Sequence, residues 1–518
     1  MSNYIAAIDA GTGSGRCVIF DTQGTQIALA SREWSHPSLP DYPGSFVFDT
    51  EQNWKLLCES VREALQRANL VSDDICGVSA TSMREGMVLY DKEGKEIWAC
   101  PNVDSRARTE VSQLIKKGLA KKIYFRGGDW LAITSPPRFL WIKKHQRKIY
   151  ERMAHMTMIS DWILYRLSGN FVTDPSAGSS SDLFQLSKRT WSDEIIKWCG
   201  LPRHIFPRVF EPGTVIGEVT SNASNETGLK KGTPVVQGGA DTQLGLIGIG
   251  AVDPNDSTTI GGTFWQQTIV TDKPVIDPQL RLRTLCHAFP SLWMTEGIGF
   301  LCGLTMRWFR DAFCGREKEM ASQQRVDPYL LLEKEAEKVP PGSNGIIPIF
   351  SDVMNAKRWM HASPSFVQFD INQPDKSGVK ECFRAIEESA AYVAKGHMKI
   401  LDEITKRKTK QIVFCGGASK GLLWPQILAD VLGVEVKIPV VRESTALGAA
   451  ICAGVGVKLF PDLKAGKRLV KWNRVVEPDR TTHEKYIRLY KQWTEVYGRM
   501  VRLVEDKLVD PMWRAAGT

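Results

Sequence analysis

A short strand, a glycine-rich turn and a return strand occur near the start of the chain and again near its middle. Residues 4–21 place the turn 9–15 between two apolar runs, and residues 257–270 place the turn 261–263 between two further apolar runs. The two copies share this layout without sharing a sequence. Because 518 residues exceed the usual size of one domain, the repeated hairpin predicts two domains of similar architecture.

The segments that follow each hairpin alternate between helix and strand patterns. Leu57, Val61 and Leu65 recur with helical spacing and predict a helix at Thr50–Ala68, with Thr50 as its N-cap. Further elements are predicted from apolar runs and periodicity: a strand at 75–81, a helix at 381–402, a strand at 410–415 and a helix at 422–432. This mixture of helices and strands predicts an α/β fold.

A glycine-rich seam separates the two halves of the sequence. We therefore expect an N-terminal domain at 1–250, a C-terminal domain at 251–460 and a basic helical tail at 461–518 that packs on the body. Thr481 and Glu484 in the tail are typical of a capping box. Apolar residues then repeat at helical steps of three and four: Tyr486, Tyr490, Trp493, Tyr497, Met500 and Val504. Two facing domains favour a small-molecule site in the cleft between them.

Composition narrows the class of protein. A membrane span needs about 20 apolar residues in a row, and the sequence has no such run and no recognisable signal peptide. The 11 cysteines are scattered through apolar surroundings, which is typical of free thiols in a reducing cytoplasm. The net charge is +9, and the tail supplies most of the excess. A solvated helix face explains this better than a nucleic-acid or lipid surface, so we expect a cytoplasmic protein without such partners.

The first glycine turn carries groups that can hold phosphate. Thr12, Gly13 and Ser14 combine backbone amides with two hydroxyls, and Arg16 adds a cation. Asp9 precedes the turn, where a carboxylate can hold Mg²⁺ through water. The same turn also fits an ordinary structural hairpin. A strand follows it and no Gly-Lys-Ser/Thr ending is present, which excludes the dinucleotide fingerprint and the P-loop.

Two more glycine turns lie in the second half. Gly262 and Thr263 occupy the place that corresponds to the first turn, so two phosphate-sized turns would face each other across the cleft. Gly416, Gly417 and Lys420 lie between a strand and a helix, where the chain can pass close to a nucleoside. Paired turns indicate a phosphate-bearing ligand more specifically than a single turn does.

Carboxylates and arginines follow several buried strands. Asp241 comes after an apolar run and two glycines, where a carboxylate can take a proton from a hydroxyl that attacks a phosphoryl group. Arg84 and Glu85 can bind hydroxyl groups from two sides, and Asp104 with Arg106 forms a similar pair. Each also has a structural interpretation: a helix N-cap for Asp241, and surface ion pairs for the others.

The order of these motifs resembles the FGGY family of carbohydrate kinases. The likeness rests on Asp-x-Gly-Thr, Arg-Glu, Asp-x-Arg, Gly-Gly-x-Asp, Gly-Gly-Thr and Gly-Gly-Ala-Ser in that order, with supporting segments at 161–176 and 443–448. It covers about residues 4–455. It implies two ribonuclease-H-like domains of the actin or Hsp70 ATPase type that face a cleft. It also implies ATP and Mg²⁺ as cofactors, and phosphoryl transfer to a polyol or ketose hydroxyl.

The resemblance also implies roles for individual residues. Asp241 matches the catalytic base, and Asp9 and Asp241 match the carboxylates on the metal side. Positions that match substrate contacts are Arg84, Glu85, Asn102, Asp104 and Asp241. Positions that match ATP or phosphate contacts are Thr12, Gly13, Ser14, Arg16, Gly262, Thr263, Gly303, Arg307, Gly416, Gly417 and Lys420.

The chain resembles one branch of the family in particular. The stretches that carry this likeness are 82–86, 102–106, 261–267, 303–311 and 348–352. Members of that branch phosphorylate a linear five-carbon dihydroxy-dione, a quorum-sensing signal, on its terminal hydroxyl. Asn102 stands where many pentulose and glycerol kinases carry tryptophan, so an aromatic wall is replaced by an amide that can hydrogen-bond a second carbonyl. Arg307 stands where glycerol kinases carry glutamine.

Other functions stay open at this point. A pentulose or polyol kinase, similar to xylulokinase or ribulokinase, would share the ATP machinery and differ only in the acceptor. An actin-like, ATP-driven binding protein would need no acceptor, and the pair Arg84 and Glu85 argues against it. Some kinases of this family are controlled by phosphotransferase-system proteins, so such a regulator is a candidate partner. The sequence pattern does not fix the oligomeric state.

Overall fold

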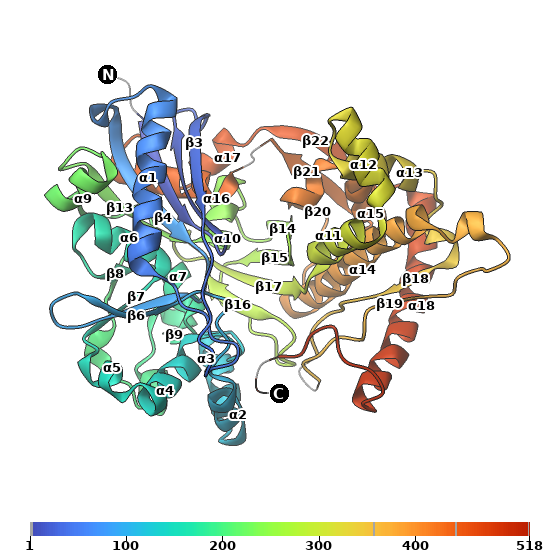
Figure 1. Ribbon diagram of the computed structural model, residues 1–518, viewed down its shortest axis with the longest axis horizontal. Helices are drawn as coiled ribbons and strands as arrows, with labels where there is room; N and C mark the ends of the chain where they lie inside the picture. Colours follow the sequence, from blue (N-terminus) through green and yellow to red (C-terminus); the bar gives the residue numbers. More distant parts are fainter. Residues whose placement is uncertain (1–3, 356–357, 441–442, 516, 518) are drawn as a thin grey trace.

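The computed structural model describes residues 4–355, 358–440, 443–515 and 517. Two large β-sheets lie beside each other, each with helices packed against it (Figure 1). In the described part of the chain, the N-terminal sheet has six strands in the order β12-β13-β4-β1-β2-β3. Their bounds are β1 Tyr4–Ala10, β2 Ser14–Phe20, β3 Gln26–Glu33, β4 Ile75–Ser82, β12 Val215–Glu218 and β13 Pro234–Ala240.

The C-terminal sheet has seven described strands in the order β16-β17-β15-β14-β20-β21-β22. Their bounds are β14 Ser257–Gly261, β15 Trp265–Thr271, β16 Arg283–Cys286, β17 Trp293–Gly299, β20 Gln411–Cys415, β21 Glu435–Pro439 and β22 Trp472–Val476. The hairpins β1–β2 and β14–β15 are antiparallel, and β1 with β4 and β14 with β20 are parallel. Apart from β16, the two sheets therefore repeat one strand order, which confirms the predicted duplicated α/β fold.

Short strands and helices complete the two halves. The short strands are β5 Met87–Tyr90, β6 Glu96–Cys100, β7 His155–Met158, β8 Val172–Thr173, β9 Phe184–Gln185, β10 Thr190–Trp191, β11 Arg208–Val209, β18 Ile347–Ile349 and β19 Ser365–Val367. The helices of the first half are α1 Thr50–Ala68, α2 Arg108–Lys116, α3 Leu119–Gly127, α4 Ser135–His145, α5 Arg147–Arg152, α6 Ile159–Ser168, α7 Pro175–Ser180, α8 Asp193–Trp198, α9 Ser221–Thr227 and α10 Asp241–Gly248. Those of the second half are α11 Cys302–Phe313, α12 Gly315–Gln324, α13 Pro328–Ala336, α14 Val379–Thr405, α15 Leu423–Leu432, α16 Ser444–Gly456, α17 Ala465–Leu469 and α18 Arg480–Glu505.

Two helix caps differ from the sequence-based prediction. The helix α1 spans Thr50–Ala68 as predicted, but its N-cap is Asp49, whose carboxylate accepts the Gln52 N–H at 2.9 Å. The helix α18 begins at Arg480 with Asp479 as its N-cap, so the capping box predicted at Thr481 is wrong. In both cases an aspartate upstream of the threonine takes the cap, because its short carboxylate is among the best N-cap acceptors.

The two halves exchange helices at their interface. The helix α10 follows a strand of the N-terminal sheet, yet Leu246 and Ile249 pack with residues of the C-terminal sheet. The helix α16 follows the C-terminal sheet and packs against Ile5 and other residues of the N-terminal sheet. The two helices touch where glycine permits it. A Cβ on Gly448 would lie 1.9 Å from the carbonyl oxygen of Leu244.

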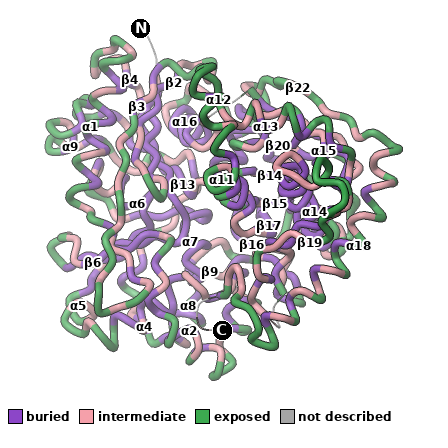
Figure 2. The backbone as a smooth tube through the Cα atoms, turned by 45° about the vertical axis from the view of Figure 1, so that its right-hand side comes forward, coloured by how far each residue is buried: buried purple, intermediate pink, exposed green. Residues whose placement is uncertain are grey.

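The tail after α16 packs on the body. Tyr486, Trp493 and Tyr497 of α18 are buried in the core of the second half, and the Trp493 indole donates to the carbonyl of Pro348 at 2.7 Å. β22 adds an edge strand to the C-terminal sheet. Figure 2 shows the contrast between the buried sheets and the largely exposed α12.

Candidate active site

The carboxyl ends of three parallel strands bring the predicted catalytic residues together. β1 pairs with β4 through Asp9↔Thr81, and β13 pairs with β4 through Ala240↔Ser82. Asp9 therefore lies near the end of β1, and Arg84 follows the end of β4. Asp241 follows β13 directly as the first residue of α10. Because parallel strands end at the same edge of a sheet, all three side chains reach one place.

Asp241 has the environment of a proton acceptor. Its Oδ1 accepts the Thr242 N–H at 2.6 Å and lies 3.8 Å from Arg84 Nε. Burial raises the pKa of Asp241 to about 6, and the guanidinium of Arg84 opposes part of this rise. The charges of Asp9 and Glu85 raise the pKa further. A carboxylate with a pKa of about 6 is still mostly ionised at pH 7 and is a better base than an ordinary aspartate.

Asp9 and Arg16 connect the first glycine turn to the second half of the chain. Arg16 Nε donates to Asp9 Oδ2 at 2.8 Å across the β1–β2 pair. Its Nη1 donates to Glu443 Oε2 at 2.9 Å, immediately before α16. Burial raises the pKa of Asp9, and Arg16 lowers it in part. Arg16 is thus tied to two carboxylates, and a direct contact with phosphate stays a prediction.

The first glycine turn lies at the protein surface, and its carbonyls accept hydrogen bonds from a neighbouring segment. Thr12 and Gly13 are exposed, and the Gly11 N–H donates to the carbonyl of Ser14 at 2.9 Å. The Trp34 indole donates to the Thr12 carbonyl at 3.1 Å, and the Thr12 hydroxyl donates to Asn102 Oδ1 at 3.2 Å. The turn is therefore oriented before any ligand binds, and Asn102 lies beside it.

Three glycine elements meet at the carboxyl ends of β14 and β20. Gly416 has φ +92°, and a Cβ there would lie 2.7 Å from the Gly261 carbonyl oxygen. A Cβ on Gly303, at the start of α11, would lie 2.1 Å from the carbonyl oxygen of Gly262. The Gly303 N–H donates to the carbonyl of Thr263 at 3.2 Å. These close approaches require glycine and bring the predicted nucleotide-side segments together.

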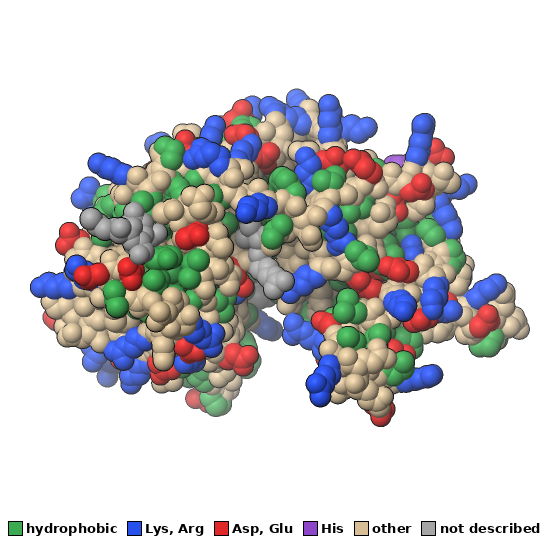
Figure 3. Space-filling model, turned by 90° about the horizontal axis from the view of Figure 1, so that it is seen from above, with side chains coloured by type: hydrophobic (Ala, Val, Ile, Leu, Met, Phe, Trp, Pro, Cys, Tyr) green, Lys and Arg blue, Asp and Glu red, His purple; other side chains and the backbone are tan. Residues whose placement is uncertain are grey.

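The remaining nucleotide-side residues flank these turns. Arg307 is exposed one turn of α11 after Gly303. Gly417 begins a short 3₁₀ turn that ends at the exposed Lys420. Burial raises the pKa of Glu443, and the charges of Arg16 and Lys420 lower it in part. Seen from above, the surface is hollowed between the two halves (Figure 3).

Asp104 occupies a different environment from the other predicted substrate residues. Its side chain is fully buried, and Oδ2 accepts from Arg106 Nε at 2.7 Å and from the Phe46 N–H at 2.8 Å. Arg138 Nε lies 3.8 Å from its Oδ1. Asp104 therefore organises the loop that carries Asn102, and its contact with a substrate stays a prediction.

Sequence reasoning missed three charged residues of the site. Arg138 is buried and donates to the main-chain carbonyls of Glu85, Pro101 and Asp104. The only signal in the sequence was an arginine within an otherwise apolar stretch. Arg283 and Glu296 reach the site from the C-terminal sheet, and nothing near them in the sequence marks them. They were missed because they are about 200 positions away from their partners.

Comparison with known proteins agrees with this arrangement. The sequence matches the N-terminal domain of the FGGY family of carbohydrate kinases over residues 4–248, and the C-terminal domain of that family over residues 260–457. The chain belongs to the FGGY family of carbohydrate kinases. It is therefore an enzyme of the carbohydrate kinase class, and the resemblance inferred from its motifs is confirmed.

Full-length relatives and solved structures extend the family match. The chain is 47% identical over 518 residues to the autoinducer-2 kinase of Escherichia coli (strain K12), with 99% of this chain and 98% of that protein covered. It is 46% identical over 519 residues to the autoinducer-2 kinase of Yersinia enterocolitica, with the same coverage. The crystal structure of xylulose kinase from Rhodospirillum rubrum superposes with a TM-score of 0.85 at 24% identity, covering 96% of this chain and 99% of that one. The last likeness shows the FGGY kinase fold.

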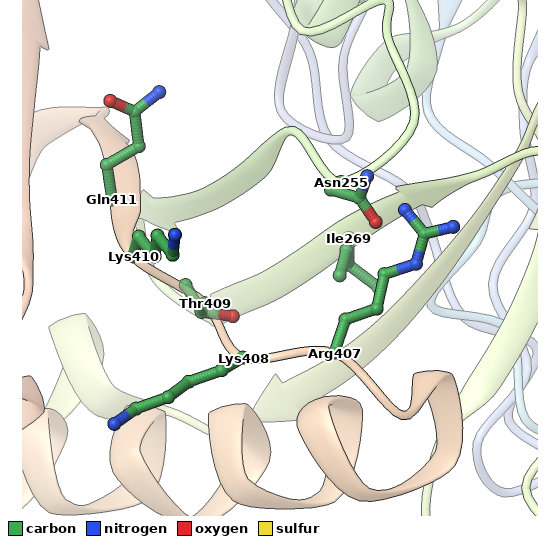
Figure 4. Close-up of a pocket in the computed structure, with 7 residues that line it drawn as sticks. All are labelled: Asn255, Ile269, Arg407, Lys408, Thr409, Lys410 and Gln411. Atoms are coloured by element: carbon green, nitrogen blue, oxygen red, sulfur yellow. The ribbon is translucent and has the colours of Figure 1, made fainter.

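A separate pocket lies at the opposite end of the C-terminal sheet. It is lined by Asn255, Ile269 and the segment 407–411, which contains Arg407, Lys408 and Lys410 (Figure 4). β14 and β20 begin beside this pocket, whereas the glycine turns follow their carboxyl ends. None of the predicted catalytic, substrate or nucleotide residues lines it.

Proposed function

We propose that this FGGY kinase transfers the γ-phosphoryl group of ATP to the terminal hydroxyl of linear autoinducer-2, 4,5-dihydroxypentane-2,3-dione. The observation that carries the proposal is the 47% identity over nearly the whole chain to an autoinducer-2 kinase. The product would be the phosphorylated signal in quorum-sensing signal processing. The arrangement supports it: the candidate base follows a strand of the N-terminal sheet, and the glycine elements assigned to the nucleoside lie at the C-terminal sheet.

The proposed mechanism assigns the proton transfer to Asp241. The acceptor hydroxyl would approach its carboxylate, which takes the proton as the oxygen attacks the γ-phosphorus. Arg84 lies 3.8 Å from the same carboxylate and can donate to the acceptor's oxygens. Closing the cleft would exclude water and so limit the hydrolysis of ATP.

The nucleotide would lie along the C-terminal sheet. We assign its phosphates to the turns at Thr12–Ser14 and Gly262–Thr263, and its nucleoside side to Gly303, Arg307, Gly416, Gly417 and Lys420. The support is that Gly261, Gly303 and Gly416 are forced together by contacts that a side chain would disrupt. Exposed backbone amides in such turns are suited to phosphate oxygens.

Mg²⁺ fits the site only together with ATP. Within the described residues, no group of three or more His, Cys, Asp or Glu side chains is placed to hold a metal ion. Asp9 and Asp241 are close enough for one charge to raise the pKa of the other. Mg²⁺ is commonly held by one or two carboxylates with phosphate oxygens and water, so these two residues would hold it. When bound, it would neutralise charge that develops on the transferred phosphoryl group.

We propose that Asn102 determines the specificity of the kinase for a dione substrate. Its Oδ1 accepts a hydrogen bond from the Thr12 hydroxyl, and this bond orients the side-chain amide. An amide can donate to a carbonyl oxygen, whereas the tryptophan of many pentulose and glycerol kinases offers an aromatic face. A linear dione presents two adjacent carbonyls, and a ketose presents one.

A panel of acceptors tests the proposal. ATP-to-ADP turnover would be measured with the linear autoinducer-2 dione, D-xylulose, L-ribulose, D-ribulose and glycerol at equal concentrations. The expected result is turnover with the dione at least tenfold above each other acceptor. A preference for a pentulose would keep the mechanism and replace the substrate. If no acceptor supports turnover while ATP still binds, the assignment of a kinase for this class of substrate is rejected.

The setting of the reaction is also proposed. Within the described residues, no helix combines the length and apolar character that crossing a membrane requires. All 11 cysteines are free thiols, and nearly all are buried, which suits a reducing cytoplasm where ATP is available. A phosphotransferase-system protein is the proposed regulator, and repeating the panel with such a protein added tests this.

We propose to divide the chain at residues 250 and 460. The support is that β13 and α10 end the first repeat and α16 ends the second. Residues 461–518 then form the tail, with α17, β22 and α18. Limited proteolysis, which prefers exposed and flexible segments between domains, is the measurement that checks these limits.

A further inference from the structure

After α18 the tail returns from the second half to the first half. In Figure 1 it runs from the end of α18 toward α2. Its described residues beyond Pro511 are 512–515 and 517, which together are called the strap. The carbonyl of Gly517 accepts the Ser112 hydroxyl of α2 at 2.7 Å. A Cβ on Gly517 would lie 2.7 Å from the Arg108 carbonyl oxygen, so the strap approaches α2 closely enough to exclude a side chain.

Main-chain hydrogen bonds anchor the strap in the second half. The His361 N–H donates to the Trp513 carbonyl at 3.0 Å, and the Ala515 N–H donates to the Trp359 carbonyl at 2.9 Å. An antiparallel bridge lies between these two bonds. The strap is therefore bound to the second half by a short strand pairing and to the first half by its contact with α2.

The strap also packs beside the predicted phosphate turn of the second half. The Trp513 ring lies 4.1 Å from the Phe300 ring between centroids. Phe300 in turn lies 5.7 Å from Phe264, which directly follows the turn Gly262–Thr263. The strap is thus in contact with the segment that borders the cleft.

A stack of two indoles joins the halves next to the strap. Trp130 of the first half and Trp359 of the second half have ring centroids 4.7 Å apart and planes inclined by 17°. Both indole N–H groups are shielded from water, and neither has a hydrogen-bond acceptor among the described residues. Trp359 has φ +48°, which a bulky residue adopts only where its surroundings enforce it. Stacking and the bond from the strap to its main chain therefore hold Trp359 in place.

The stack lies close to a predicted substrate residue. The Trp130 N–H donates to Asp129 Oδ1 at 2.7 Å, and Asp129 Oδ2 accepts from Arg283 Nη1 at 3.1 Å. The same Nη1 donates to Glu85 Oε1 at 2.8 Å. Only two side chains thus separate Trp130 from Glu85. The stack is placed at the end of the cleft where the acceptor is expected.

We propose that Trp130 and Trp359 close the acceptor end of the cleft, and that the strap positions Trp359 for this role. The inference rests on the proposed function, because it concerns the site of that reaction. A closed wall at this end would keep water from the γ-phosphoryl group and confine the acceptor near Glu85. Since the strap and the stack both join the two halves, losing either one should loosen the same end of the cleft.

Turnover with and without an acceptor tests the stack. Trp359→Leu keeps an apolar side chain and removes the stacking. We expect the KM for the linear dione to rise about tenfold, with the KM for ATP within about twofold. ATP hydrolysis without an acceptor should rise about fivefold, because water enters the site. Trp359→Phe keeps a ring and should restore most of both values, whereas Trp472→Leu, on the edge strand β22, should change neither.

Gly517→Ala tests the strap without altering either indole. At φ +81° the added methyl group meets the Arg108 carbonyl oxygen, so the strap should detach from α2. We expect the KM for the dione and the acceptor-independent hydrolysis to rise about threefold each. Gly498→Ala in α18 is the matched control, because no described atom lies within 4 Å of a Cβ built there. It should behave as the unmodified enzyme.

Hydrogen exchange in the ligand-free protein separates this inference from the proposed function. Peptides that cover 129–132 and 359–362 report on the two sides of the stack. Gly517→Ala should speed exchange about fivefold in both peptides, and Gly498→Ala in neither. Faster exchange in 359–362 alone overturns the proposal, and so do an unchanged KM for the dione and unchanged hydrolysis in Trp359→Leu. If both peptides respond but no acceptor reacts with the unmodified protein, the strap is supported and only the kinase assignment fails.

Discussion

Replacing Asp241 by asparagine should nearly abolish turnover and also stabilise the folded protein at neutral pH. The carboxylate accepts the Thr242 N–H at 2.6 Å, and an amide oxygen can keep that bond. The substitution therefore removes the charge and the base while preserving the local geometry. We expect kcat to fall about 10²- to 10⁴-fold. The KM for ATP should change little, since the glycine elements assigned to the nucleoside lie on the other sheet.

The gain in stability follows from the pKa of Asp241. Burial raises it to about 6 from an ordinary 3.8, so folding disfavours the charged form. At about 1.4 kcal/mol per pKa unit, the penalty at pH 7 is about 3 kcal/mol. The side chain is 37% exposed, and solvent screening reduces this to about 1–2 kcal/mol. This penalty is absent below the pKa that Asp241 has in the unfolded chain and complete above its pKa in the folded protein. The stability that Asp241→Asn gains should therefore disappear as pH falls from 7 to 4.

Urea denaturation of both proteins at pH 7 and at pH 4.5 measures this difference. Asp253→Asn is the control, because Asp253 is 43% exposed and ion-paired with Lys467, which lowers its pKa. That variant should gain no stability at either pH and keep full activity. The reasoning is refuted if Asp241→Asn is less stable at pH 7 than the unmodified protein, or if it keeps more than a tenth of kcat.

Three further substitutions test separate parts of the site. Gly416→Ala places a Cβ 2.7 Å from the Gly261 carbonyl oxygen at φ +92° and costs about 1–2 kcal/mol of backbone strain. It should raise the KM for ATP more than the KM for the acceptor. Equal changes in both KM values would contradict the assignment. Arg138→Met leaves several buried carbonyls unpaired and should lower the free energy of unfolding by about 3 kcal/mol or more in urea. Asn102→Trp should reduce kcat/KM for the dione at least tenfold in the acceptor panel, and full activity would remove Asn102 as the specificity determinant.

Local features of the fold could be predicted from the sequence. The helix at Thr50–Ala68 was predicted with its bounds, because its apolar residues keep helical spacing over several turns. The strands before each glycine turn were found within one or two residues, because apolar runs bounded by glycine are distinctive. The caps were wrong because several polar residues near a helix start can accept the same N–H groups.

Long-range features could not be predicted in this way. Nothing in the sequence near Glu296 indicates that it binds Arg84, 212 positions earlier. The order of motifs predicted the family and, through it, the role of Asp241. The burial of the Asp104 side chain inside its loop is seen only in the structure. Pairings of this kind depend on how the two sheets dock, and that is decided by the summed packing of both halves and by no single segment.

The exchange of α10 and α16 has a consequence for how the chain reaches its native state. During synthesis, the first sheet is complete at about residue 240, but the helix that covers it, Ser444–Gly456, emerges some 200 residues later. Until then the part of the apolar face around Ile5 that α16 covers stays open. A fragment that ends at residue 250 would keep this face open and would expose Leu246 and Ile249 as well. Such a fragment should aggregate or bind chaperones, and the nascent protein should acquire protease resistance only after α16 has left the ribosome.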